Sequence, residues 1–462
     1  MKESKTSLVF AIIAMLAAFI VFMGTVNSTL PAAVKFTVAV GALVCCGMAV
    51  SRVFNLDGGY GLILLKSRKG LDFLDSVSQR WPDFWQTFAE IGLVVGYGSF
   101  AYFLIEKRKF SWKRVLTVYG TGAVLLVILN GIVAPFAMSA LFSMISGGDE
   151  FAGAGSKLSA SMAQIDYLKY VFLAIMAVGG IATSTMLSIA IFSATVVGSV
   201  AGVFLGNGQQ LSQTTPGGTP IIPGINLDLV QGVIALAVVL IVHEGAHGIV
   251  ARLYKLPLKA AGIVFFGFLP FGAFVDIDEK KLFKEKPHRQ NTVFVAGTAA
   301  NFATSLVFLA LFLLIGYSTQ GLMAKGLFVE SGTLPQGAQI LSINGTAIES
   351  FASANLLPNS TYSVETSKGT FERTTNAQGK IGITYSTERY PEEFGWLRWL
   401  LRLFAMIFAL NYVVAAINLV AIPLFDGYYI MKNGVNNKLV ETAIVYLIVF
   451  AFALNMLPWL FR

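Results

Sequence analysis

Charge is scarce in this 462-residue sequence. Only 13% of the residues are charged whereas 55% are hydrophobic, and the mean hydropathy is +0.70. Soluble globular domains carry about 25% charged residues, and a single core surrounded by water could not bury this much apolar surface. The composition therefore excludes an ordinary soluble protein and predicts a polytopic membrane protein.

Cysteine is almost missing as well. The two cysteines, Cys45 and Cys46, are neighbours in an apolar run, so they can form neither a disulfide framework nor, alone, a metal site. The net charge of +8 comes without a basic cluster interleaved with aromatic residues, and we expect no nucleic-acid partner. In a membrane protein such an excess more often reflects cytoplasmic loops.

Apolar runs long enough to cross a bilayer recur along the chain, because a hydrocarbon core about 30 Å thick needs roughly 20 apolar residues in a helix. Predicted spans lie near 6–26, 34–51, 87–105, 115–143, 167–205, 229–253, 291–316, 399–420 and 440–460. The run 167–205 is too long for one span and contains a glycine pair, so we expect a helical hairpin there. The sequence thus predicts about ten transmembrane helices. The segment 319–396, with short alternating apolar runs, predicts a small β-rich extramembrane domain.

Basic residues predict the orientation of the second half. The segment 206–227 has no Lys or Arg, whereas the segment from Arg252 to Arg289 contains eight basic residues. Cytoplasmic loops carry the excess of positive charge, so the span ending near Leu253 is expected to run from outside to the cytoplasm. Continued alternation places the insert 319–396 outside. In the first half the basic residues leave the topology open.

Two of the only three histidines, His243 and His247, lie four residues apart, and Glu244 completes an HExxH motif. Residues i and i+4 share one face of a helix, so both imidazoles can bind one Zn²⁺ while Glu244 reaches a metal-bound water. An ionisable cluster inside an apolar span is costly without such a partner. The alternative is a packed histidine pair with Glu244 neutralised by a loop lysine.

Catalytic zinc usually takes three protein ligands, so the third must come from another segment. Asp426 follows Pro423, which interrupts a helix, and precedes Gly427, which frees the backbone beside the carboxylate. Broken helices at membrane depth are tolerated where they line a cavity, although a plain helix exit would show the same residues. Glu90, at the start of a span, and His288, in a basic loop, are the other candidates. The need for a third ligand favours Asp426.

Residues of about 220–435 resemble the site-2 protease family of intramembrane zinc metalloproteases. The landmarks occur in the family's order at 223–225, 243–247, 267–275, 296–302 and 418–427. The resemblance implies that His243, His247 and Asp426 bind one Zn²⁺ per chain and that Glu244 is the catalytic glutamate. It also implies a substrate-binding or scaffold role for Asn301, Asn418, Gly297, Gly267, Phe268 and Pro270. Thr298 and Ala421 stand where the family often has proline, which removes no ligand.

Two further segments resemble parts of the family. The run 267–275 resembles its membrane-associated β-hairpin, expected to clamp an unwound substrate by strand pairing, because pairing satisfies amides that helix unwinding leaves bare. An amphipathic interfacial loop is the alternative. The run 335–348 reads as strand, Asn-Gly turn and strand and resembles the second part of a PDZ domain. Peptide capture and a size-excluding or regulatory cover stay open as its role.

Together with the HExxH motif, the resemblance implies an intramembrane zinc metalloprotease that hydrolyses peptide bonds within or near the transmembrane segment of single-span membrane proteins. By analogy with prokaryotic members of that family, the expected location is the plasma membrane of a prokaryote, with the active site toward the cytoplasm. A transporter or a metal or proton relay is the competing class, but no second half matches the unit 229–316 as an inverted repeat would.

The expected organisation has five parts. Residues 1–205 form a transmembrane region without an assigned role, and 206–318 form the first part of the catalytic core. The PDZ-like insert is 319–396, and residues 397–435 supply the second part of the core with Asp426. A C-terminal transmembrane helix fills 436–462.

Overall fold

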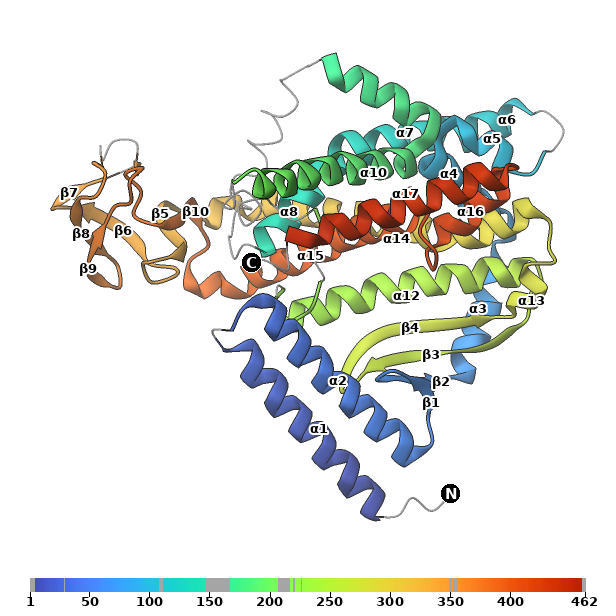
Figure 1. The fold of residues 1–462 in the computed structure, drawn as a ribbon, viewed down its shortest axis with the longest axis horizontal. Helices are drawn as coiled ribbons and strands as arrows, with labels where there is room; N and C mark the ends of the chain where they lie inside the picture. Colours follow the sequence, from blue (N-terminus) through green and yellow to red (C-terminus); the bar gives the residue numbers. More distant parts are fainter. Residues whose placement is uncertain are drawn as a thin grey trace. The chain divides into compact units, whose positions relative to one another are not determined.

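The computed structural model describes residues 5–28, 30–107, 111–145, 167–206, 217–218, 221–225, 227–348, 350–351 and 356–458. Within these residues, nine helices are long and apolar enough to cross a membrane, which confirms a polytopic helical membrane protein (Figure 1). The chain divides into two compact units. One comprises Met1–Ala134, Asp166–Ser305 and Leu410–Arg462, and the other comprises Pro135–Ile165 and Leu306–Ala409.

The candidate spans are built from long helices and from series of shorter ones. The long helices are α1 (Lys5–Val26), α2 (Ala32–Phe54), α4 (Pro82–Tyr97), α10 (Tyr167–Phe204), α12 (Leu229–Leu253), α14 (Pro287–Thr319), α15 (Gly395–Asn418) and α17 (Lys438–Met456). The shorter helices are α3 (Arg68–Arg80), α5 (Ala101–Leu104), α6 (Trp112–Arg114), α7 (Thr121–Ile128), α8 (Ala134–Ile145), α13 (Glu279–Leu282) and α16 (Asp426–Gly434). Two π-helical segments, Val115–Gly120 and Leu129–Val133, connect α6, α7 and α8.

Helix α10 contains the break expected for the run 167–205. Gly180 has φ 65° and ψ −161°, a backbone conformation that is essentially restricted to glycine. The two arms of α10 meet there at a sharp bend (Figure 1). A Cβ at Gly180 would also lie 2.3 Å from the carbonyl oxygen of Gly96. In this run one segment, Leu173–Phe204, qualifies as a span, and the described residues hold nine candidate spans, in line with the expected number of about ten.

The first unit holds a four-stranded antiparallel sheet in the order β1-β2-β3-β4. Its strands are β1 (Asp57–Gly59), β2 (Leu62–Lys66), β3 (Leu258–Phe266) and β4 (Leu269–Ile277). The expected β-hairpin is therefore present, with its turn at Gly267, where φ is 61°. Strand β4 lies beside α12, and β2, from the N-terminal region, pairs with the other edge of β3 (Figure 1).

The second unit holds the β-rich insert expected between α14 and α15. Strands β5 (Ala324–Gly332), β6 (Gln339–Ile343), β8 (Thr361–Thr366), β9 (Gly369–Thr374) and β10 (Ile383–Arg389) form an antiparallel sheet in the order β10-β5-β6-β8-β9, and β7 (Thr346–Ala347) pairs with β6. Asn344 and Gly345 both have positive φ, as the two-residue hairpin turn requires. Val329, Ile340 and Val364 lie in the apolar core of the insert. The likeness of this insert to a PDZ domain stays a prediction.

Candidate metal centre

Helix α12 presents both histidines of the HExxH motif from one face. The side chain of Asp228 accepts a hydrogen bond from the Gln231 N–H (3.0 Å) and starts the helix. One turn apart, His243 and His247 are buried, with exposed fractions of 7% and 8%. Their Nε2 atoms lie 3.1 Å from each other. Two ring nitrogens from positions i and i+4 therefore face one point.

The third group, Asp426, comes from a break between two helices. Helix α15 ends at Asn418, and the chain re-enters helical geometry at Asp426, the first residue of α16. The connection folds back closely, because a Cβ at Gly427 would lie 2.1 Å from the carbonyl oxygen of Leu419. Glycine after the aspartate thus permits the approach that brings Oδ2 of Asp426 to 3.3 Å from Nε2 of each histidine.

These three atoms fit a tetrahedral cation. Ligand atoms about 2.05 Å from a tetrahedral Zn²⁺ lie about 3.3 Å apart, and the three distances here are 3.1, 3.3 and 3.3 Å. Within the described part of the chain, Oδ2 of Asp426 is buried and makes no well-aligned hydrogen bond. Three facing lone pairs without a donor between them are costly unless a cation lies among them. His243, His247 and Asp426 thus form a group that could bind a metal ion.

The far nitrogen of each histidine is fixed by a neighbour on α14. Nδ1 of His247 lies 2.7 Å from the carbonyl oxygen of Val293. A carbonyl oxygen only accepts, so Nδ1 carries the proton and Nε2 keeps its lone pair. Nδ1 of His243 lies 3.2 Å from Nδ2 of Asn301, which is fully buried, while Oδ1 of Asn301 has no partner among the described residues.

Rotation of the Asn301 carboxamide by 180° makes its contact with His243 a hydrogen bond that the amide oxygen accepts. The rotation exchanges Oδ1 and Nδ2 at nearly the same positions, so Oδ1 then accepts a proton from Nδ1 of His243. This protonation again leaves the Nε2 lone pair for a metal. Such outer contacts orient metal ligands and select their tautomer. Asn301 and the Val293 carbonyl therefore hold the two imidazoles in metal-binding form.

The carboxylate of Glu244 contacts the sheet. The backbone N–H of Val275 on β4 donates to Oε2 of Glu244 (3.4 Å). This N–H points to α12 rather than to β3, so it belongs to the outer edge of β4. The glutamate therefore lies between the candidate metal group and a strand edge that could hold an extended peptide.

Gly297 is a neighbour of both imidazoles. A Cβ there would lie 2.5 Å from Nε2 of His247 and 2.7 Å from Cε1 of His243. Asn418 is the half-buried last residue of α15, and among the described residues none of the contacts of the ligand atoms involves it. Of these two, only Gly297 lies against the metal group.

The three hairpin residues of the predicted site lie at the turn, several residues from Val275. A Cβ at Gly267 would lie 2.8 Å from the carbonyl oxygen of Leu43 on α2. The ring of Phe268 packs edge to face on Phe19 and Phe22 of α1, and Pro270 pairs with Phe265. The structure therefore does not bring these residues to the histidines.

The other candidates for the third ligand have different partners. Glu90 is buried and pairs with Arg114, whose Nη2 lies 2.9 Å from Oε1. Nε2 of His288 lies 3.4 Å from Oε1 of Glu106. Within the described residues neither side chain belongs to the group that could hold a metal.

The backbone partners of the site left no signal in the sequence, because a carbonyl or N–H is present at every residue. This applies to Val293, Val275 and Leu419, whose carbonyl oxygen accepts a hydrogen bond from the Tyr97 hydroxyl (3.3 Å). Tyr97 is buried in α4, and its type is common in apolar spans. Only the three-dimensional arrangement identifies these contacts.

The fold and the site together define a membrane-embedded protein in which an HExxH helix meets a distant aspartate. Residues 231–457 match the sequence model of peptidase family M50, which is the site-2 protease family. The match covers 227 of the 462 residues, so a little under half of the chain is similar to that family. An uncharacterized protein of Methanocaldococcus jannaschii is 28% identical over 218 residues. The match covers 44% of this chain and 56% of that protein, a little over half of the relative's length.

Proposed function

We propose that the protein is an intramembrane zinc metalloendopeptidase that cuts single-span membrane proteins within or near their transmembrane segment. The observation that carries this proposal is the meeting of His243, His247 and Asp426, whose ligand atoms lie 3.1 to 3.3 Å apart. The match of residues 231–457 to peptidase family M50 supports the same class of activity. The division of the chain into five parts, given above, stays part of the proposal.

The donor set suits zinc because two imidazoles and one carboxylate are common ligands of catalytic Zn²⁺ and leave a fourth position open. When bound, Zn²⁺ supplies a Lewis acid that polarises the scissile carbonyl and lowers the pKa of a coordinated water toward about 7. Asn301 and the Val293 carbonyl keep the imidazoles in the tautomer that this binding needs.

Glu244 is the proposed general base. Glu244 follows His243 directly on α12, so its backbone lies beside the metal group. Its carboxylate contacts the edge of β4 at Val275. From there it takes a proton from the attacking water and then delivers that proton to the leaving amine. The N–H of Val275 orients the Glu244 carboxylate in the absence of substrate. When a peptide pairs with β4, the peptide replaces the carboxylate as the partner of this N–H.

The outer edge of β4 supports an extended peptide as substrate. The amides of a transmembrane helix are already bonded within the helix, so a segment must unwind before it is cut. Pairing with β4 would satisfy the amides that unwinding releases. A single-span protein is the simplest substrate that unwinds locally in a bilayer. We propose the plasma membrane of a prokaryote as its location, with the metal group toward the cytoplasmic side and the insert outside.

A cleavage assay with metal analysis tests the proposal. A tagged single-span protein is incubated in detergent with the protein, with Glu244→Gln and with Glu279→Gln, a matched change at an exposed glutamate of α13. Glu244→Gln should lower the cleavage rate by about 10²- to 10⁴-fold and keep about one zinc per chain. His243→Ala should lose the zinc. Unchanged cleavage by Glu244→Gln, or an equal loss in Glu279→Gln, rejects the assigned base.

A further inference from the structure

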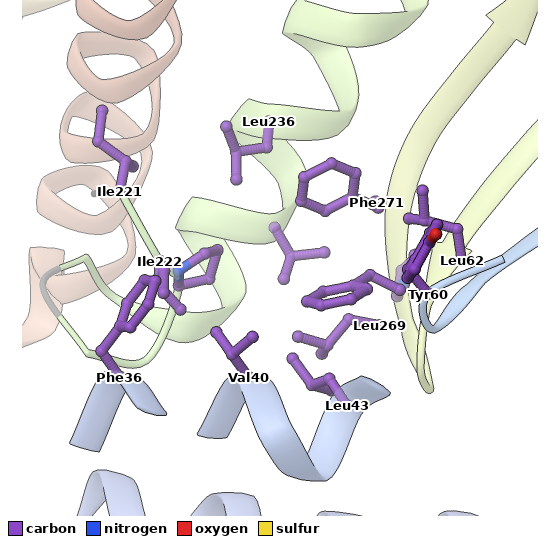
Figure 2. A pocket seen from close by; sticks show the side chains of 14 residues that line it. Phe36, Val40, Leu43, Tyr60, Leu62, Ile221, Ile222, Leu236, Leu269 and Phe271 are labelled. Carbon is purple, nitrogen blue, oxygen red and sulfur yellow. The ribbon is translucent and has the colours of Figure 1, made fainter. Parts of the chain in front are cut away.

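An apolar pocket lies between the N-terminal region and the hairpin turn. Its volume is about 360 Å³, and Figure 2 shows side chains from three directions around it. Phe36, Val40 and Leu43 come from one face of α2, Leu236 comes from α12, and Phe271 comes from β4. None of the described residues that line it carries a charge, and the Tyr60 hydroxyl is the one polar side-chain group among them.

We propose that this pocket binds a large apolar side chain of the unwound substrate, about four residues from the cut bond. This inference rests on the proposed function and deepens it. It also gives a role to residues 36–62, which lie before the part of the chain that matches family M50.

Two independent spacings place the pocket relative to Glu244. On α12, eight residues separate Leu236 from Glu244, about 12 Å at 1.5 Å per residue. On β4, four residues separate Phe271 from Val275, about 13 Å at 3.3 Å per residue. The helix and the strand run together between these points, because a Cβ at Gly272 would lie 2.5 Å from the Leu240 side chain. A peptide extended along β4 therefore reaches the pocket four residues from the bond beside Glu244.

A β-bulge supports this assignment. Val264 pairs with Gly272 and Phe265 pairs with Pro270, so Phe271 is the extra residue on β4. A bulge re-aims a side chain and is common beside active sites. Here Phe271, which is 38% exposed, is one wall of the pocket (Figure 2).

A side chain of the substrate fits this pocket better than any polar ligand. The lining offers no charge to pair with a headgroup or an ion, so a charged occupant would lose its hydration without compensation. The pocket also continues the strand edge to which the substrate is proposed to add. Leu, Ile, Met and Phe are the abundant side chains of transmembrane segments, and all of them are expected to bind.

Photo-cross-linking tests the place of binding without catalysis. The Glu244→Gln variant is mixed with a single-span test substrate that it binds but does not cut. The substrate carries benzoylphenylalanine at one position, from the first to the sixth residue on either side of a cut bond mapped with the unmodified protein. We expect the fourth position on one side to cross-link to Val40 or Leu236. Positions beside the cut bond should cross-link to α12 near His243. Cross-links at the cut bond without any to the pocket overturn this inference alone, whereas none to α12 or β4 overturns the proposed function as well.

Cleavage kinetics test the selectivity. Val40→Trp fills the pocket, and the matched control Val38→Trp changes a residue of the same helix that is 39% exposed and lies outside the lining. Val40→Trp should lower kcat/KM about 10-fold or more for a substrate with Leu at the cross-linked position, and less than about twofold for one with Gly there. In the unmodified protein, Asp at that substrate position should lower kcat/KM by about 100-fold.

A second variant keeps the test decisive if Val40→Trp loses zinc or has a lower melting temperature than the unmodified protein. Phe36→Ala enlarges the pocket and should shift the preference from Leu toward Trp. Equal effects of Val40→Trp on the Leu and Gly substrates overturn the inference. So does an effect that follows the acyl-chain length of reconstituted vesicles rather than the substrate residue, because the pocket would then hold lipid.

Discussion

Gly297→Ala tests the packing of α14 against the two imidazoles. The added methyl carbon would lie 2.5 Å from Nε2 of His247 and 2.7 Å from Cε1 of His243. Carbon and nitrogen atoms pack at about 3.5 Å or more, so α14 or the rings must move by about 1 Å. Metal–ligand bonds tolerate only about 0.2 Å. The methyl group therefore displaces the ligands rather than merely crowding them.

The expected loss has two parts. Overpacking should lower the free energy of unfolding by about 1–3 kcal/mol. Displacement of the imidazoles should weaken zinc binding by about 10- to 100-fold, the range seen when outer contacts of metal ligands are changed. Zinc Kd is measured in detergent by competition with a fluorescent chelator, and thermal unfolding is followed with and without the chelator.

A matched change on the same helix separates the site effect from helix propensity. Nothing lies within 4 Å of a Cβ at Gly316, so Gly316→Ala should leave zinc Kd unchanged and stabilise the helix slightly. If Gly297→Ala binds zinc with the affinity of the unmodified protein, α14 does not approach the histidines as described. The assignment of the Val293 and Asn301 contacts would then be refuted too.

Three further changes probe other contacts. Asn301→Leu should raise zinc Kd by about 10- to 100-fold, measured by the same competition, whereas Asn301→Asp keeps an acceptor and most of the affinity. Gly180→Ala forces a side chain into a glycine-only conformation and should lower the melting temperature, whereas Gly198→Ala in the same helix has open space and should not. The Arg252 guanidinium, by hydrogen bonding, holds the pKa of Asp75 below its usual value. This carboxylate stabilises the fold above its unfolded pKa of about 3.9 and loses that effect as pH falls through the lower folded pKa. Asp75→Asn should therefore cost about 1 kcal/mol or less at pH 7 and approach no cost in acid, as measured by unfolding at several pH values.

The sequence predicted both the polytopic fold and the side chains that form the metal group. Membrane spans can be predicted because a run of about twenty apolar residues has the length that a helix needs to cross the hydrocarbon core. His243 and His247 predict one helical face by their spacing alone. Asp426 is 179 positions from His247 in the sequence, and only the requirement for a third ligand, together with Pro423 and Gly427, pointed to it.

Other features depend on contacts that residue types do not specify. The strands Asp57–Gly59 and Leu62–Lys66 are short and belong to a segment of mixed composition, and β2 is completed only by pairing with β3. The hairpin turn residue Phe268 looked like part of the site because of the family resemblance, yet it packs on α1. The break in α10 lies at Gly180, whose backbone torsions are not helical. The sequence does not show which glycine breaks a helix, because glycine also occurs within straight helices.

The pairing of β2 with β3 makes the segment before α12 indispensable to the rest of the fold. If the chain were shortened to begin at α12, β3 would lose its partner along Gly262–Phe266 and expose a row of bare amides and carbonyls. An uncovered strand of this kind recruits other chains and promotes aggregation. Expression of the family-matched half alone is therefore expected to give insoluble or cross-associated material, and the leading helices are best regarded as part of one indivisible folding unit.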